Sequence, residues 1–332
     1  MYRHRTQRIP IRRRRSPMTA LVTFLCLVVL FFGVYAIAST IQEQNSYDIN
    51  SNGSYLLSIE DQTPDQNETA TDYAASQPSQ YSQSNASTQE IAQPTAQIFT
   101  IEQLAEMSND HLLLINRDFP VPYHIAGYLV RISDYLQTLN QDTLLSKDAL
   151  VMLRAMFDSA ASVGYTQFRV TEGFRTHEHQ QMLYTSMAGT GLAAPPGHSE
   201  HQVGLAVDIS YHGVNIGNSS QGTWLMDYSY RYGFILRYPE HKTEITMVPF
   251  EPWHYRFVGQ PHAYFMKRND LVLEEYIAYL RRRGEIAVDF EGVRFTVHYM
   301  FGAGETIEIP KDYLFAASRD NTGGVIVTVA SQ

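Results

Sequence analysis

The longest apolar run in the chain is a 21-residue stretch without charge, from Met18 to Ala38. As a helix it would be about 31 Å long, which matches the hydrocarbon core of a bilayer. Arginines precede this stretch and no Lys or Arg follows it before Arg117, so the positive-inside rule predicts a membrane anchor whose N-terminus is cytoplasmic. A cleaved signal peptide is the alternative, because residues 36–38 (AIA) are typical of a cleavage site. The apolar core of such a peptide is usually only about 7–15 residues long.

A polar region follows the apolar stretch. Between residues 42 and 93 the chain is rich in Ser, Gln, Asn and Thr, and it has acidic but no basic residues. Such a composition cannot bury enough apolar surface to offset the entropy lost on ordering. The sequence therefore predicts a basic cytoplasmic tail over residues 1–17, a transmembrane helix over 18–38 and a disordered extracytoplasmic tether over 39–97.

From about Ile98 onward, apolar residues recur with the periods of helices and strands. Between Ser146 and Tyr165 they lie three or four positions apart, with a serine that can cap a helix at the start and Gly164 near the end. The run from Leu112 to Ile115 predicts a short buried strand, and the run from Phe168 to Thr171 predicts another. The same reasoning predicts helices over residues 176–187, 223–232 and 270–283.

After Gly284 the period changes to that of strands. Residues 286–290, 293–300 and 325–329 predict short strands, and Glu291-Gly292 is typical of a turn. Helices and strands mixed in this way predict an α+β fold, with a small mixed or antiparallel sheet and flanking helices. The expected domains are a main domain over residues 98–265 and a helix with a β-rich appendage over residues 266–332.

Composition and charge narrow the possible functions. The 332 residues include 25 Lys and Arg against 34 Asp and Glu, and seven of the basic residues lie within the first 15 positions, so the remainder is strongly acidic. A folded part without a basic face is not expected to bind nucleic acid. The single cysteine, Cys26, excludes an intramolecular disulfide framework and a cysteine-rich zinc module.

The candidate chemistry lies between residues 175 and 254. Residues 199–209 read SEHQVGLAVDI, and the acid Asp208 stands in an apolar, strand-like run where it needs a partner. The motif EPWH begins 43 residues later and ends at His254. His201, Asp208 and His254 can offer two imidazole nitrogens and one carboxylate oxygen to Zn²⁺ and leave the fourth tetrahedral position to water. Glu251 can take a proton from such a water and pass it to a leaving amine.

These motifs resemble those of the VanY-type D-alanyl-D-alanine carboxypeptidases of the zinc-dependent M15 peptidase family. The resemblance runs from about Leu112 to Gly259. It rests on S-x-H-x-x-G-x-A-x-D with a downstream E-x-W-H, and on EGFR at 172–175, PGHS at 196–199 and RYGFILRYP at 231–239. It implies a fold of the Hedgehog and D-Ala-D-Ala peptidase type. The β-rich appendage after about residue 285 lies outside it.

The resemblance also implies roles for individual residues. Glu251 would be the general base and acid, and Arg175 the cation that polarises the scissile carbonyl and stabilises its oxyanion. Ser199 and Gln180 would lie near the terminus of the substrate. Family members often have a glycine after the Ile-Thr pair that precedes the glutamate, whereas this chain has Met247. Three residues would be the zinc ligands: His201, Asp208 and His254.

The implied reaction is removal of the C-terminal D-Ala from the stem pentapeptide of peptidoglycan or of its lipid-linked precursor. It would take place outside a bacterial cell membrane, to which the N-terminal anchor holds the protein. A zinc-bound water would attack the D-Ala-D-Ala bond, and Glu251 would protonate the released D-Ala. The serine route to the same reaction needs an S-x-x-K motif, which the chain lacks.

Four alternatives remain. They are an L,D-carboxypeptidase acting on stem tetrapeptides, a dipeptidase acting on free D-Ala-D-Ala, a wall endopeptidase, and a non-catalytic wall-binding module on the same fold. A dipeptidase fits an external location poorly, because the free dipeptide is cytoplasmic. Glu251 argues against a binding module, because binding alone needs no base beside a metal. The same zinc site serves D,D and L,D cleavage, so the sequence leaves that choice open.

Overall fold

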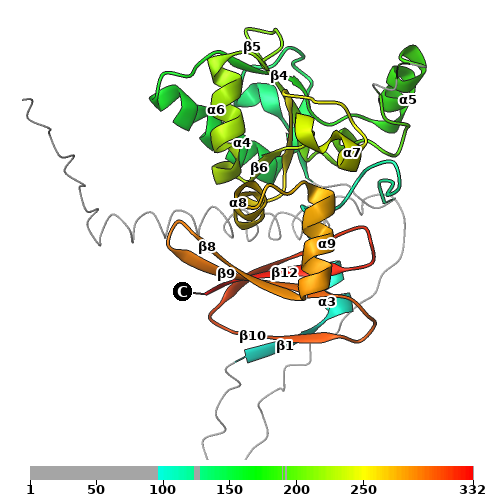
Figure 1. Ribbon diagram of the computed structural model, residues 1–332, viewed down its shortest axis with the longest axis vertical. Coiled ribbons are helices and arrows are strands. Elements are labelled where there is room, and N and C mark those ends of the chain that lie inside the picture. The colour runs from blue at the N-terminus through cyan, green and yellow to red at the C-terminus, as the bar shows by residue number, and fades with distance from the viewer. Residues whose placement is uncertain (1–95, 123–127, 189, 191–192, 332) are drawn as a thin grey trace, which may run out of the picture.

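The computed structural model describes residues 96–122, 128–188, 190 and 193–331, and these form two parts (Figure 1). The upper part in the figure is built on a four-stranded antiparallel sheet with helices around it. This architecture confirms the predicted α+β class with a small antiparallel sheet. In order across the sheet, its strands are β4 (Phe168–Glu172), β5 (Ala206–Tyr211), β7 (His254–Phe257) and β6 (Phe234–Leu236).

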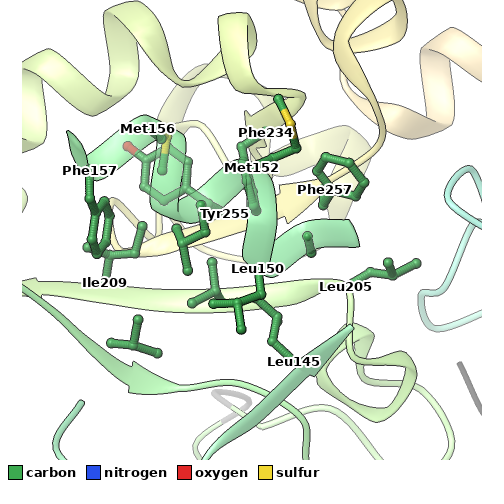
Figure 2. Packing of buried hydrophobic residues seen from close by; sticks show 14 of the residues in the cluster. Leu145, Leu150, Met152, Met156, Phe157, Leu205, Ile209, Phe234, Tyr255 and Phe257 are labelled. Carbon is green, nitrogen blue, oxygen red and sulfur yellow. The ribbon is translucent and has the colours of Figure 1, made fainter. Parts of the chain in front are cut away.

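Helix α4 (Lys147–Ser162) packs against this sheet. The Ser146 side chain caps its first turn by accepting a hydrogen bond from the Ala149 amide at 3.3 Å. The apolar face of the helix and the sheet share one buried cluster, which includes Phe157 from α4, Ile209 from β5 and Tyr255 from β7 (Figure 2). The predicted helix and its cap are confirmed.

Shorter elements complete the upper part. The helix predicted over residues 176–187 is confirmed as α5 (His177–Ser186). The one predicted over residues 223–232 begins earlier, because Ser219 accepts a hydrogen bond from the Gly222 amide and starts α6 (Ser220–Tyr228). The last four residues of the predicted helix form the 3₁₀ turn η5 (Ser229–Tyr232). The remaining elements are β2 (Leu129–Arg131), η3 (Ile132–Asp134), β3 (Leu144–Ser146), η4 (Glu200–Val203), η6 (Glu240–Lys242), α7 (Thr243–Thr246) and α8 (Gln260–Arg268).

The lower part, here called the C-terminal module, comprises residues 273–331 together with residues 96–106. Its antiparallel sheet has the strand order β11-β12-β9-β8, and α9 (Leu273–Arg283) packs on this sheet. The predicted helix over 270–283 and the three predicted strands are confirmed. Two further strands, β10 and β11, were not predicted. The strands are β8 (Glu285–Phe290), β9 (Val293–Met300), β10 (Thr306–Pro310), β11 (Leu314–Arg319) and β12 (Val325–Ser331).

The first described residues belong to this module and not to the upper part. Strand β1 (Ala96–Thr100) pairs with β10 in antiparallel register (Figure 1). Helix α3 (Ile101–Glu106) follows, and Ile101 and Leu104 join Phe99 in the apolar cluster beneath β11 and β12. The expected boundaries therefore differ here: residues 96–97 are strand and not tether, and residues 98–106 pack on the C-terminal sheet. Because β1 and β10 lie more than 200 residues apart in the sequence, no local pattern predicts that they pair.

The run from Leu112 to Ile115 is buried but is not a strand. The Leu112 amide donates to Ser318 Oγ at 2.9 Å, and the Leu114 amide donates to the Asp320 carbonyl at 3.1 Å. The Leu113 carbonyl accepts from Arg256 Nη2 at 3.0 Å. The backbone of this run is thus hydrogen-bonded to separate groups and not to a neighbouring strand. Because these groups belong to both parts, the run joins the C-terminal module to the upper part.

No helix among residues 96–122, 128–188 and 193–331 is long and apolar enough to cross a membrane. The predicted basic tail, the predicted transmembrane helix over 18–38 and the predicted tether up to residue 95 lie outside the described residues.

A buried histidine where α8 meets the C-terminal module makes the stability of the protein depend on pH. The ring nitrogens of His262, on α8, hydrogen-bond with the hydroxyls of Tyr276 at 2.7 Å and Thr328 at 3.0 Å, and burial, with a smaller effect of His111, lowers the pKa of His262 to about 3. The unfolded chain binds this proton below pH 6.5 and the folded chain does not. Stability is therefore expected to fall by about 1.4 kcal/mol per pH unit from pH 6.5 downward.

The test compares urea unfolding of the wild type and His262→Gln at several pH values between 7 and 4. The glutamine can keep both hydrogen bonds but does not titrate, so its unfolding free energy should fall less steeply than that of the wild type, by about 3 kcal/mol in total between pH 7 and pH 4. Parallel curves for the two proteins would contradict the prediction.

Candidate active site

Three side chains from separate elements meet at one end of the upper sheet. His201 lies in η4, which ends at Gly204 in a left-handed conformation with φ of 67°. The chain then enters β5, which carries Asp208, and the register of β5 with β7 places Asp208 opposite His254. Sheet pairing therefore joins two residues that lie 46 positions apart.

The three side chains form a compact group. Asp208 Oδ1 lies 3.0 Å from His254 Nδ1 and 3.5 Å from His201 Nε2. Their ligand atoms all lie within 4.8 Å of one another, and no other group of three His, Cys, Asp or Glu residues in the described ranges meets this condition. The second nitrogen of His201, Nδ1, hydrogen-bonds the Gly173 carbonyl at 2.7 Å, which leaves Nε2 as the nitrogen that faces the group.

The side chains of this group stabilise one another's charges. Burial alone would raise the pKa of Asp208, but the facing His201 and His254 hold it well below its ordinary value. Burial alone would lower the pKa of His254, yet Asp208 and Glu200 raise it to about 9. Two imidazole nitrogens and one carboxylate oxygen are a common protein ligand set for a zinc ion with one open position. The residues present therefore fit zinc.

Glu251 lies beside this group. Its Oε2 is 3.9 Å from His254 Nδ1, and its amide donates to the Tyr238 carbonyl at 3.1 Å, which fixes the backbone at this point. Burial raises the pKa of Glu251 to about 7; His254 opposes this effect, and the nearby charge of Asp208 adds to it. The structure thus brings together the four residues that the EPWH and SEHQVGLAVD motifs contribute.

Arg175 follows β4 and is tied to the same loop, because its amide donates to the His201 carbonyl at 3.0 Å. The guanidinium is buried; Nη1 donates to Gln180 Oε1 at 2.7 Å, and Nη2 lies 3.4 Å from Glu172. Its Nε is buried and has no hydrogen-bond partner among the described residues. A buried donor without a partner is costly, and a substrate carbonyl oxygen would satisfy it.

The two remaining predicted residues lie nearby. Gln180 is buried and uses both ends of its amide, because Oε1 accepts from Arg175 and Nε2 donates to the Ala194 carbonyl at 2.7 Å. It therefore orients Arg175. Ser199 is buried and directly precedes η4.

Sequence reasoning missed three buried charged residues behind His254. Glu200 Oε2 lies 3.4 Å from His254 Nε2, and Glu200 Oε1 accepts from Arg237 Nε at 2.8 Å and Arg256 Nη1 at 3.0 Å. Burial alone would raise the pKa of Glu200, but the two guanidinium groups hold it well below its ordinary value. Arg237 lies within RYGFILRYP, and Arg256 lies in the apolar run of β7. A charged residue inside an apolar run was the only sign in the sequence that these side chains are buried and paired.

The loop before Glu251 contains a residue other than glycine in a left-handed conformation. Met247 ends α7 in a left-handed conformation with φ of 57° and ψ of 21°, and its side chain is 61% exposed. A side chain in this conformation costs about 1–2 kcal/mol, whereas glycine adopts it freely at a smaller entropic cost. We expect Met247→Gly to raise the unfolding free energy by about 0.5–1 kcal/mol in urea titrations.

The control for this prediction is Ile245→Gly. Ile245 is also exposed but lies inside α7, so glycine there should lower stability. Lower stability of Met247→Gly than of the wild type would contradict the prediction.

Comparisons with known proteins agree on one family. The family model described as VanY, D-alanyl-D-alanine carboxypeptidase, matches residues 142–260. A D-alanyl-D-alanine carboxypeptidase of Enterococcus faecium is 36% identical over 227 residues, which cover 66% of this chain and 75% of that protein. The bifunctional D-Ala-D-Ala dipeptidase and carboxypeptidase VanXYC of Enterococcus gallinarum is 34% identical over 189 residues, covering 51% of this chain and 94% of that protein.

A solved structure resembles the chain over a similar extent. The vancomycin resistance D,D-dipeptidase VanXYg, solved in complex with a D-Ala-D-Ala phosphinate analogue, superimposes with a TM-score of 0.61 and 25% identity, covering 71% of this chain and 98% of that one. The match of 227 residues with the Enterococcus faecium protein is longer than the stretch from Leu112 to Gly259. The similarity to relatives therefore extends beyond the motifs that first indicated it.

Proposed function

Because the chain belongs to the VanY family of D-alanyl-D-alanine carboxypeptidases, we propose that this peptidase removes the C-terminal D-Ala from peptidoglycan stem pentapeptides with the help of zinc. One observation carries the proposal. His201, Asp208 and His254 gather their ligand atoms within 4.8 Å, and the Glu251 carboxylate lies beside them. A peptidase that uses water as its nucleophile needs such a cation site with an adjacent base.

His201, Asp208 and His254 would hold the zinc ion. When bound there, zinc supplies Lewis acidity, which polarises the scissile carbonyl and makes a water molecule more acidic. Arg175 would donate from its unpartnered Nε to the carbonyl oxygen and stabilise the negative charge that develops on it. Gln180 would keep the guanidinium in place through the 2.7 Å bond to Nη1.

Glu251 would move the proton. It would take one proton from the water as the water oxygen attacks the carbonyl carbon, and return it to the amine nitrogen as the C–N bond breaks. The products would be the stem tetrapeptide and D-Ala. Ser199 would lie near the bound terminus of the substrate.

We further propose that Met18–Ala38 anchors the protein in the bacterial cell membrane with residues 39–332 outside. The support is the uncharged apolar stretch with arginines only on its N-terminal side. Such a location would give the active site access to stem peptides of the wall or of its lipid-linked precursor.

The test incubates the purified protein with stem pentapeptide or stem tetrapeptide, with and without a zinc chelator, and follows the products by mass spectrometry. Release of one D-Ala from the pentapeptide alone, abolished by the chelator, is the expected result. Cleavage of the tetrapeptide would move the protein to the L,D-carboxypeptidases. Cleavage of neither, with zinc bound, would favour an endopeptidase or a non-catalytic wall-binding module.

A further inference from the structure

We propose that Glu200 is a positioning residue for the zinc site, held by a chain of charges that begins at the partly exposed Glu274 on α9 and continues through two buried arginines. The inference rests on the proposed function in one respect, namely that His254 binds zinc. Glu200 touches neither metal nor substrate in this scheme; it acts through the His254 ring.

The His254 ring lies between two carboxylates. Its Nδ1 faces Asp208 Oδ1 at 3.0 Å, and its Nε2 faces Glu200 Oε2 at 3.4 Å. A zinc ion held by His254 and Asp208 would take the lone pair of Nδ1, which leaves the ring hydrogen on Nε2. Glu200, which accepts a hydrogen bond but cannot donate one, is placed to accept from that Nε2 and so favours this ring form. The Gly173 carbonyl serves His201 in the same way through Nδ1. Each histidine is thus held by the nitrogen that points away from the site.

Glu200 itself is held rigidly. Its side chain is fully buried, and its Oε1 accepts from Arg237 and Arg256, which are also fully buried. Arg256 also donates to the carbonyls of His111, Leu113 and Phe257. With its position fixed by two guanidinium groups, the Glu200 carboxylate limits the rotation of the His254 ring.

The chain of charges continues to α9. Arg237 Nη1 and Nη2 donate to the two carboxylate oxygens of Glu274 at 2.8 and 2.6 Å. Glu274 Oε1 also accepts from Asn116 Nδ2 at 3.1 Å. Glu274 lies in the C-terminal module, beyond residues 142–260 that the family model matches. The C-terminal module thereby supplies a carboxylate that, together with Glu200, balances the positive charge of Arg237 behind the zinc site.

The energetics argue against a purely structural role. Burying the three charged groups of Glu200, Arg237 and Arg256 costs desolvation energy, and well-packed apolar side chains of similar volume often stabilise a core at least as well. A carboxylate behind a ligating histidine, in contrast, raises the basicity of the ligand and fixes its ring form. Apolar side chains could not do either.

The experiment uses the full chain and measures the zinc dissociation constant by competition with a chromophoric chelator. The central variant is Glu200→Asp, which keeps the negative charge between the arginines but withdraws the carboxylate from His254. We expect it to fold and to bind zinc about 10- to 100-fold more weakly. Glu200→Gln and Glu274→Gln should weaken binding in the same direction. Glu275→Gln is the matched control, because Glu275 is adjacent on α9 but pairs with Lys242, so affinity should be unchanged.

A second readout separates positioning from packing. In ¹⁵N spectra of the zinc-loaded protein, the wild-type His254 ring should carry its hydrogen on Nε2, and Glu200→Asp should change the Nε2 signal. Glu200→Asp that folds, binds zinc as the wild type does and keeps this signal would overturn the inference while leaving the proposed function intact. A wild type that binds no zinc would overturn both. If the variants weaken zinc binding as expected but the wild type releases no D-Ala, the inference is supported and the proposed function is not.

Discussion

Glu251→Gln is expected to keep its zinc and to lower the rate of D-Ala release by about 10²- to 10⁴-fold, the range usual for loss of a general acid–base group. The variant leaves His201, Asp208 and His254 unchanged and keeps a side chain of the same shape, but an amide cannot carry the proton from water to the leaving amine. The measurements are kcat/KM with stem pentapeptide and zinc content per chain.

Glu244→Gln is the control for this prediction. Glu244 lies in α7, in the loop that leads to Glu251, and it is exposed, so the same charge change there should leave the rate unaltered. A rate for Glu251→Gln within tenfold of the wild type would show that another group accepts the proton.

His254→Ala is expected to lose both zinc and activity. The variant removes one of the three proposed zinc ligands, and the loss of affinity should exceed the ~10- to 100-fold that follows loss of an outer-shell partner. It also leaves Asp208 and Glu200 facing each other without the imidazole between them, so these carboxylates repel. Zinc content after dialysis and D-Ala release are the two readouts.

The matched control is His241→Ala, which removes an exposed histidine paired with Asp270 and should keep full zinc content and rate. A His254→Ala variant that retains one zinc per chain would mean that the third ligand is another residue.

The sequence predicted the metal group because its geometry is largely local. Two residues of η4, then Gly204 and Leu205, separate His201 from the start of β5, and the alternation of β5 fixes the side on which Asp208 lies. His254 joins the group through the register of neighbouring strands, which a shared motif can indicate without any knowledge of the sheet. The helix α4 was predictable for the same reason, since its cap and its apolar face lie within one short segment.

The buried charges behind the site were not predictable in this way. Glu200, Arg237, Arg256 and Glu274 come from four separate segments of the chain, and each alone has the sequence context of a surface charge next to apolar neighbours. Their burial becomes visible only when η4, β7 and α9 are packed together. For the run from Leu112 to Ile115 the sequence predicted an element that does not form. The run has the composition of a strand, but its hydrogen-bond partners are a hydroxyl, a single backbone carbonyl and a guanidinium.

The pairing of β1 with β10 bears on how the chain folds during synthesis. The strands of the upper sheet all lie between residues 168 and 257, so this sheet can form as soon as that stretch has left the ribosome or the translocation channel. Phe99, Ile101 and Leu104, although made earlier, pack on strands that end at Ser331. The module therefore has a high contact order and must form last. A chain that stops short of β12 would leave Phe99, Ile101 and Leu104 exposed. We expect such truncated chains to aggregate or be degraded even though every residue of the proposed zinc site is present.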